Sequence, residues 1–253
     1  MTFPFPSSGV NFVPGAVNFD GTNDQVGRGA DLTGTADGKA FTLSGWCDPS
    51  TDQVNRILTA NLTLGGGTGA DISLGVALTA TGAPILSARN AAGTIILNLQ
   101  TSTTPILAAN GWHHLYVAID LANASNRHIY VNGVSQGLTV TTYTDDAIDM
   151  TVADWTIGAT SNGTNRFVGD LAEIWFDDVF LDPSTNLSFF ARNNKPQNLY
   201  ADGSRPTGTA PLVYLGGHSR YNGLTSAWHN NRGTGGGFTV TGALTDASTN
   251  PSK

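Results

Sequence analysis

The sequence has almost no cysteine, and this shortage excludes two classes of protein. Its 253 residues include one cysteine, so no disulfide can form within the chain and no cysteine-based zinc site is available. The single thiol, Cys47, follows Gly45-Trp46 in a β-rich run. We expect it to be a small, buried, apolar residue.

Charge is also scarce. Charged residues make up 12% of the chain, about half the usual share, and the net charge is −7. The three lysines are scattered and no basic run occurs, which argues against a nucleic-acid partner, because phosphates are bound by clustered Lys and Arg. No apolar run approaches the ~20 residues needed to span a bilayer, so no membrane partner is expected.

The first residues, Met-Thr-Phe-Pro-Phe-Pro, lack the basic and apolar regions of a secretory signal, which predicts synthesis in a cytoplasm without signal-dependent export.

What the sequence does have is a recurring alternation of apolar and polar side chains. In the clearest case, Leu115, Val117 and Ile119 alternate with other residues, as in a half-buried strand. A β-rich run follows at Arg127–Val131, and Asn132-Gly133 then suits a two-residue hairpin turn. Similar runs recur about every ten residues between Gly- and Asn-rich turns, which predicts an antiparallel sandwich or barrel.

The pattern predicts three segments. Residues 1–15 form an extended N-terminal arm, residues 16–195 form a sandwich, and residues 196–253 form a Gly/Asn-rich extension. The extension has too few apolar residues for its own core, so it should return strands to the sandwich or to a partner. One short helix is predicted, at residues 186–192. The arm would dock on another subunit, since its phenylalanines would otherwise be exposed. These interface candidates are Phe3, Phe5 and Phe12.

Six short stretches occur in an order that resembles one family. The stretches are Phe19–Val26, Phe41–Trp46, Trp112–Val117, Ile129–Gly133, Ile157–Gly158 and Phe167–Trp175. Together they resemble the laminin-G-like and concanavalin A-like lectin-glucanase superfamily, over residues 16–195. The resemblance implies an all-β fold, namely a two-sheet antiparallel jelly-roll sandwich.

The tail adds a narrower resemblance. Residues 211–215 and 231–246 resemble endings of such proteins in tailed phages and prophages. This implies a non-enzymatic structural protein of a phage virion, made in the host cytoplasm and displayed on the particle surface as head decoration or as a tail-fibre component. Its partners would be major capsid or tail proteins, further copies of itself in a homo-oligomer such as a trimer, and host-surface glycans.

A lectin-like module for host adhesion is the first alternative. Sugar binding needs an aromatic platform beside amide or carboxylate groups. The aromatic candidates are Tyr116, Tyr130, Trp155, Trp175 and Trp228. Packing within the sheets explains the same residues equally well, because aromatic side chains are favoured in strands.

A glycoside hydrolase or lyase is the second alternative. It needs two carboxylates flanking the scissile bond. Glu173 and Asp177 lie four residues apart on one expected strand, so they share a face, with Trp175 between them. This order only loosely resembles the Glu-x-Asp-x-x-Glu strand of catalytic family members, and we expect no enzymatic activity.

No cofactor is required by these readings, although the family resemblance makes Ca²⁺ an option. His113 and His114 are adjacent on a strand, so they point to opposite faces and cannot chelate one metal together. Family members hold calcium at the sandwich rim through oxygen ligands, which suit this hard cation. The calcium candidates are Asp20, Asn23, Asp24, Asp145 and Asp146, with Asp149 close by. Ordinary turn chemistry accounts for the same residues.

Overall fold

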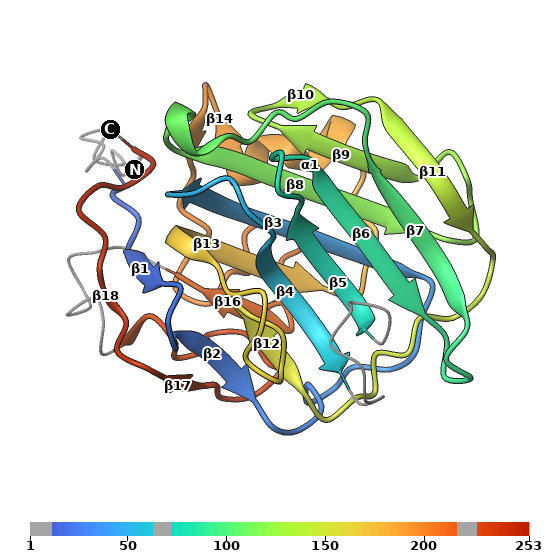
Figure 1. Ribbon diagram of the computed structural model, residues 1–253. Coiled ribbons are helices and arrows are strands. Elements are labelled where there is room, and N and C mark those ends of the chain that lie inside the picture. Colours follow the sequence, from blue (N-terminus) through green and yellow to red (C-terminus); the bar gives the residue numbers. More distant parts are fainter. Residues whose placement is uncertain (1–11, 63–71, 217–226, 253) are drawn as a thin grey trace, which may run out of the picture.

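The computed structural model describes residues 12–62, 72–216 and 227–252, and in them two antiparallel sheets stack face to face (Figure 1). The strands of sheet 1 are, in spatial order, β10 (Val134–Ser135), β9 (Arg127–Val131), β8 (His113–Asp120), β3 (Ala40–Pro49), β13 (Val168–Asp177), β1 (Ala16–Asp20) and β18 (Thr245–Asp246), with β16 (Val213–Leu215) also paired to β13. The predicted all-β jelly-roll sandwich is confirmed.

Sheet 2 packs against sheet 1 and has its own continuous order. Its strands are β11 (Leu138–Tyr143), β7 (Ile95–Thr101), β6 (Pro84–Arg89), β5 (Ile72–Leu78), β4 (Asn55–Leu62), β12 (Trp155–Ile157), β2 (Gln25–Arg28) and β17 (Thr239–Thr241). The remaining elements are the 3₁₀ turn η1 (Ala108–Asn110), the helix α1 (Pro183–Phe190) and the small hairpin β14 (Ala191–Arg192)–β15 (Lys195–Pro196).

The main core lies between the two sheets. Alternate residues of every long strand point into it, for example Leu43 and Cys47 from sheet 1 and Leu58, Val76 and Leu97 from sheet 2. Cys47 is 1% exposed, and burial raises the pKa of its thiol to about 12. The expectation of a small, buried, apolar cysteine is confirmed.

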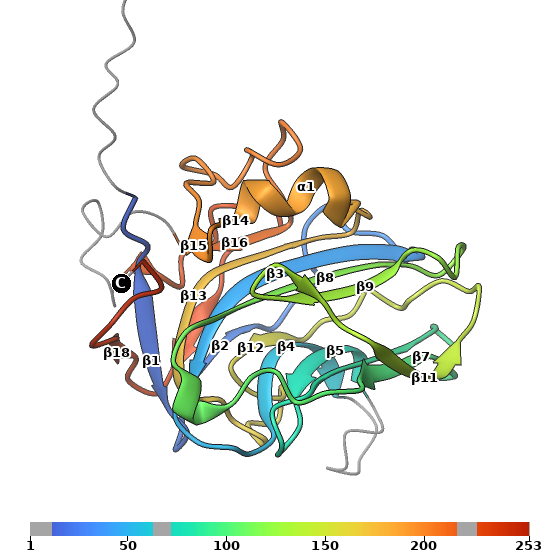
Figure 2. The ribbon, with the colours of Figure 1, turned by 90° about the horizontal axis from the view of Figure 1, so that it is seen from above.

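The centre of sheet 1 is buried on both faces. Figure 2 shows α1 lying on the side of sheet 1 that faces away from sheet 2. There Tyr116, Trp175 and Tyr214 form a second apolar cluster with Phe190 of α1 and Leu199. Covering both faces explains why nearly all residues of β3, β8 and β13 are buried.

The hairpin after β8 agrees with its prediction. Asn132 and Gly133 have φ values of 52° and 77°, as a two-residue turn with two left-handed positions requires. Strand β9 pairs with β8 before this turn, and β10 pairs with β9 after it.

The predicted helix exists, but its predicted bounds, 186–192, are wrong at both ends. The helix begins at Pro183, because the Asp182 carboxylate accepts a hydrogen bond from the Ser184 N–H at 2.8 Å and proline suits the first helical position. It ends at Phe190, because Ala191 is already extended and pairs in the β14–β15 hairpin.

The first and last described strands, β1 and β18, pair at one edge of the sandwich (Figure 1). The described part of the C-terminal extension contributes β16 to β13, β17 to β2 and β18 to β1. Of the predicted arm, Phe3 and Phe5 lie outside the described residues, and Phe12 is half-buried. Among the helices in the described ranges, none is long and apolar enough to cross a membrane.

Candidate functional site

The candidate site is a pocket of about 390 Å³ on the outer face of sheet 1, beside the C-terminal segment. Four separate parts of the chain build it: β3, the turn before β8, the β14–β15 turn and residues 249–251. The side chains with chemistry to offer are Trp46, Asp48, Asn110, Trp112, Asn194 and Asn250.

Trp46 forms the apolar floor of this pocket. Its neighbour Cys47 belongs to the main core, so the alternation of β3 directs the Trp46 indole to the outer face. There it packs with Ala16 and Ala172, whose small side chains leave room above the sheet. Its ring centroid lies 4.9 Å from that of His114, and only 2% of the residue is exposed.

Trp112 forms a wall of the same pocket. It follows Gly111, whose φ of 72° turns the chain sharply before β8 begins. The half-buried indole packs against the Trp46 cluster, and its Nε1–H donates to Thr249 Oγ1 at 2.9 Å. The C-terminal segment is held in place a second time, because Lys195 Nζ donates to the Ser252 carbonyl at 3.0 Å.

The Asp48 carboxylate is the charged hydrogen-bond acceptor of this pocket. It lies opposite Asp170 in the β3–β13 register, and burial together with repulsion from Asp170 raises the pKa of Asp48. Asn18 Nδ2 donates to Asp170 Oδ1 at 2.7 Å, which occupies that second carboxylate. No hydrogen bond within the described ranges reaches the Asp48 carboxylate, so it is free to accept one from a ligand.

Three amides line the same pocket as the carboxylate. Asn110 ends η1, Asn194 sits at the β14–β15 turn with a φ of 53°, and Asn250 belongs to the C-terminal segment. Indole rings can pack against the C–H face of a sugar, while a carboxylate and amides can bond its hydroxyl groups. The pocket therefore has the composition of a small polar-ring binding site.

Four of the five aromatic candidates for a sugar platform are packed within the protein, as the alternative explanation of these residues holds. Tyr116, Trp155 and Trp175 are 0% exposed and Trp228 is 2% exposed, because α1 and the C-terminal extension or the sandwich core cover them. The fifth, Tyr130, is half-buried beside His128.

Sequence reasoning missed the two indoles that do line a pocket. In the sequence, Trp46 and Trp112 were used only to identify strands and the family resemblance. Gly111 before Trp112 was the available signal, because a sharp turn immediately before a strand places the next side chain at the sheet's edge.

The predicted carboxylate pair lies under the covering layer of sheet 1. Glu173 occupies a bulge of β13 with a φ of 52°, is 3% exposed, and accepts a hydrogen bond from Tyr214 Oη at 2.7 Å. Asp177 Oδ1 accepts from the Leu212 N–H at 3.1 Å, and burial raises the pKa of Asp177 to about 6. Since Trp175 between them is fully buried, this strand presents no open sugar cleft.

The two histidines lie apart, as their positions on the strand predict. His114 Nε2 contacts Ser44 Oγ at 2.8 Å in a fully buried setting that lowers the pKa of His114 to about 3. His113 Nδ1 contacts Asn132 Nδ2 at 3.2 Å, and burial lowers the pKa of His113 as well. Across the described ranges, no group of three or more His, Cys, Asp or Glu side chains is arranged to hold a metal ion.

The first set of calcium candidates organises a turn. Asp20 Oδ1 accepts from the Thr22 N–H at 2.7 Å. Asp24 is 1% exposed, and its two oxygens accept from the Asp20 and Ala243 N–H groups at 3.0 and 2.7 Å. Asn23 contributes its N–H to Asp20 Oδ1 at 3.4 Å. These contacts tie the β1–β2 turn to the chain beyond β17.

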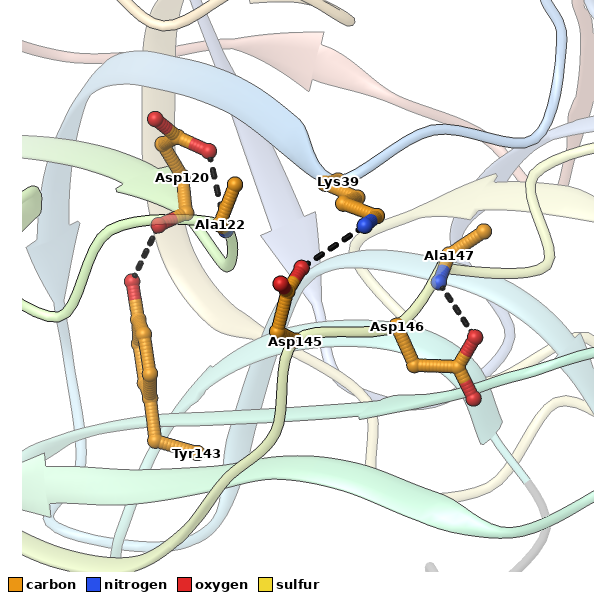
Figure 3. Close-up of polar contacts among 7 residues, drawn as sticks. All are labelled: Lys39, Asp120, Ala122, Tyr143, Asp145, Asp146 and Ala147. Carbon is orange, nitrogen blue, oxygen red and sulfur yellow. Dashed lines mark hydrogen bonds and ion pairs between the residues drawn. The ribbon is translucent and has the colours of Figure 1, made fainter.

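The second set lies on the other side of the sandwich, since β1 and β11 are at opposite sides in Figure 1. Figure 3 shows the Asp145 carboxylate directed at Lys39 Nζ, 2.7 Å away, and the Asp146 carboxylate directed elsewhere, toward the Ala147 N–H at 2.8 Å. Asp146 also accepts from Asn90 Nδ2 at 2.7 Å. The structure thus brings neither the two sets nor these two neighbours together, and calcium binding is still only the option that the family resemblance raises.

Comparison with known proteins places this fold in a family. The family model described as the concanavalin A-like lectin/glucanases superfamily matches residues 20–185. No curated protein sequence matches the chain.

Many solved structures share the fold, including the following two. A "putative carbohydrate binding protein" from Bacteroides ovatus superposes with a TM-score of 0.60 at 14% identity, over 96% of this chain and 62% of that protein, so this chain spans less than two thirds of it. A heptameric SAP-like pentraxin from Limulus polyphemus gives a TM-score of 0.53 at 15% identity, over 85% of this chain and all of that one. At these identities the likeness concerns the fold alone. With two thirds of its length matched by the family model, the chain belongs to the concanavalin A-like lectin/glucanases superfamily.

Proposed function

We propose that this protein is a non-enzymatic, lectin-like module that binds a glycan in the pocket between Trp46 and Trp112. The observation that carries the proposal is the Asp48 carboxylate, which no hydrogen bond within the described ranges reaches, beside the half-buried Trp112 indole and three asparagine amides. A lectin-type fold supports it, and so does the name of the Bacteroides ovatus relative, which refers to carbohydrate binding.

The pocket's size and position fit this use. A volume of about 390 Å³ lies within the common range for small-ligand sites, and it suits one or two sugar rings. Because the C-terminal segment forms one wall and two side-chain hydrogen bonds hold that segment, the site is formed before any ligand arrives. A preformed site loses little conformational entropy on binding.

The test is a glycan-array screen followed by calorimetry on the best-binding glycan. Trp112→Ala should weaken binding at least about tenfold, equivalent to about 1.4 kcal/mol, because the ring wall is lost. Trp112→Phe should recover part of the affinity. Tyr200→Ala is the matched control, since Tyr200 is 60% exposed on the covering layer of the same sheet but outside the pocket.

Two results would reject this function. One is an array on which no glycan is bound by the folded wild-type protein. The other is a bound glycan whose affinity for Trp112→Ala and for Asp48→Ala equals its affinity for the wild-type protein, because both residues would then be outside the site.

The placement on a phage virion, with capsid or tail partners and a trimeric assembly, rests on sequence resemblance and stays a prediction. It is compatible with glycan binding, since a displayed lectin would serve host adhesion. Mass spectrometry of purified particles tests it directly. Hundreds of copies would indicate head decoration and up to a dozen would indicate a tail component, whereas a chain absent from every particle preparation would contradict the placement.

A hydrolase or lyase is not the function we propose, because Glu173 is covered and hydrogen-bonded to Tyr214. A polysaccharide panel tests this. Turnover that Glu173→Gln abolishes, with the fold intact, would reinstate the enzymatic alternative.

A further inference from the structure

A second pocket, of about 290 Å³, lies on the outer face of sheet 2, away from the Trp112 pocket. Gly75, Ser87 and Asn98 stand in one row across β5, β6 and β7, because each is paired with the next in the strand register. Their chain neighbours, such as Val76 and Leu97, belong to the main core, so this row faces outward.

Arg56 lines the pocket, and among the described residues its charge has no partner. It is half-buried, and its Nε is buried without a hydrogen-bond acceptor. The only ion pair in the described ranges is Lys39–Asp145, and no hydrogen bond there engages the Arg56 guanidinium. A guanidinium stays ionised and has five N–H donors. When it is partly buried without an acceptor, its lost hydration raises the free energy of the folded protein, and a bound anion would offset that loss.

The rest of the pocket suits a sugar more than a bare anion. Ser87 and Asn98 can both donate and accept hydrogen bonds, as hydroxyl groups require. Val54 and Ile85 add apolar surface, and Gly75 has no side chain to fill the floor. Among the described residues, no acidic side chain lines the pocket, although the chain as a whole has a net charge of −7.

We propose that this pocket binds a single sugar ring bearing an oxyanion, with the Arg56 guanidinium paired to the anionic group and with Ser87 and Asn98 bonded to ring hydroxyls. The planar fork of arginine matches a carboxylate in two parallel hydrogen bonds. The volume lies at the lower end for small-ligand sites, which limits the occupant to about one ring. The site goes beyond the proposed glycan pocket and does not depend on it.

The test uses calorimetry and proton–nitrogen NMR of the arginine Nε–H groups in the full chain, with D-glucuronate, D-glucose 6-sulfate, D-glucose and acetate as probes. Glucuronate should shift the Arg56 Nε–H signal and bind at least about tenfold more tightly than glucose or acetate. The sulfate arm shows whether a carboxylate is required or any oxyanion on the ring suffices. Arg56→Gln should abolish the preference for the charged sugar.

Arg192→Gln is the matched control, because Arg192 is exposed on the β14–β15 hairpin and its removal lowers the positive charge equally. It should leave glucuronate binding unchanged, and the shift of the Arg56 Nε–H signal assigns that binding to this pocket and not to the Trp112 pocket. Glucuronate binding that survives Arg56→Gln, or acetate binding as tight as that of glucuronate, would overturn the proposal. The circular dichroism spectrum of Arg56→Gln confirms that any loss is not due to unfolding.

Discussion

The outer faces of the two sheets are built from the same two-residue alternation, but they differ in what packs on them. On sheet 1, α1 and the segment up to β16 cover Tyr116, Trp175 and Tyr214, so the face is an apolar layer (Figure 2). On sheet 2, the corresponding row contains Ser87 and Asn98 and lines an open pocket.

An aromatic residue on a strand therefore does not indicate a binding site unless its face of the sheet is free of a covering segment. Aromatic side chains gather where the chain folds back over the sheet, since the covering layer needs an apolar surface to bury. The two pockets that we propose as binding sites lie where this cover ends, at Trp112, and on a sheet face that no described segment covers, at Arg56.

The largest effect on stability should come from truncating one aromatic residue under the covering layer of sheet 1. Trp175→Ala should lower the free energy of unfolding by about 3–5 kcal/mol, because Trp175 is fully buried against Phe190 and its Nε1–H donates to the Gly203 carbonyl at 2.9 Å. Ser87→Ala on the outer face of sheet 2 should change it by no more than about 0.5 kcal/mol.

Urea unfolding followed by tryptophan fluorescence and circular dichroism measures both variants. Similar losses in the two variants would contradict the difference between the two faces, namely that among the described residues a covering layer packs on the outer face of sheet 1 and none packs on that of sheet 2. A loss for Trp175→Ala of less than about 1 kcal/mol would mean that α1 and its neighbours pack weakly and separate from the sheet.

A smaller effect should come from Asp177, which lies at the edge of the same cover. Burial raises its pKa from 3.8 to about 6, so the folded protein binds the proton more tightly than the unfolded chain does. Between these two pH values the wild-type protein should lose stability as the pH rises. Above about pH 6 the carboxylate is ionised, and its burial then destabilises the folded state to the full extent.

Asp177→Asn removes that cost while its amide oxygen can still accept from the Leu212 N–H. The variant should be more stable than wild type at pH 7 by about 1–2 kcal/mol, after allowance for solvent screening of a partly exposed group, and equal to it below pH 3.8. Urea unfolding across this pH range provides the measurement, with Asp246→Asn on exposed β18 as control. A variant with the same pH slope as wild type would show that Asp177 is not the titrating group.

The fold could be predicted well because local signals and the long-range arrangement agree. The alternation around Val117 and the Asn132-Gly133 turn specified strands and a hairpin without knowledge of any contact. The start of α1 was recoverable too, because Asp182-Pro183 is a capping signal that apolar spacing alone overlooks.

The sites could not be predicted in the same way. The Trp46–Trp112 pocket joins side chains that are up to about 200 residues apart in sequence, and only the packed C-terminal segment brings Asn250 to Asp48. Glu173 and Asp177 were correctly placed on one strand, but nothing local shows that Tyr214 and α1 would cover it. Burial of an outer face is a property of the whole chain.

The smallest effect should come from the rim, where neither sheet is covered. Lys39 precedes β3 and Asp145 follows β11, and their side chains are 44% and 61% exposed (Figure 3). Water and salt screen such a pair, and ordering two flexible side chains offsets most of the attraction. Lys39→Ala and Asp145→Ala should each shift the thermal unfolding midpoint by less than about 2 °C, and the shift should shrink further at high salt.

A calcium titration of the same variants separates two uses of the acidic turn. A bound ion stabilises the folded state by mass action, so calcium held by Asp145 would raise the wild-type midpoint but not that of Asp145→Ala. We expect no such rise beyond that produced by an equal concentration of magnesium, because Asp145 pairs with Lys39 and Asp146 accepts from Asn90 and the Ala147 N–H. A calcium-specific rise that Asp145→Ala removes would show instead that the ion displaces Lys39, and the rim would then be a ligand site while the covered face of sheet 1 is not.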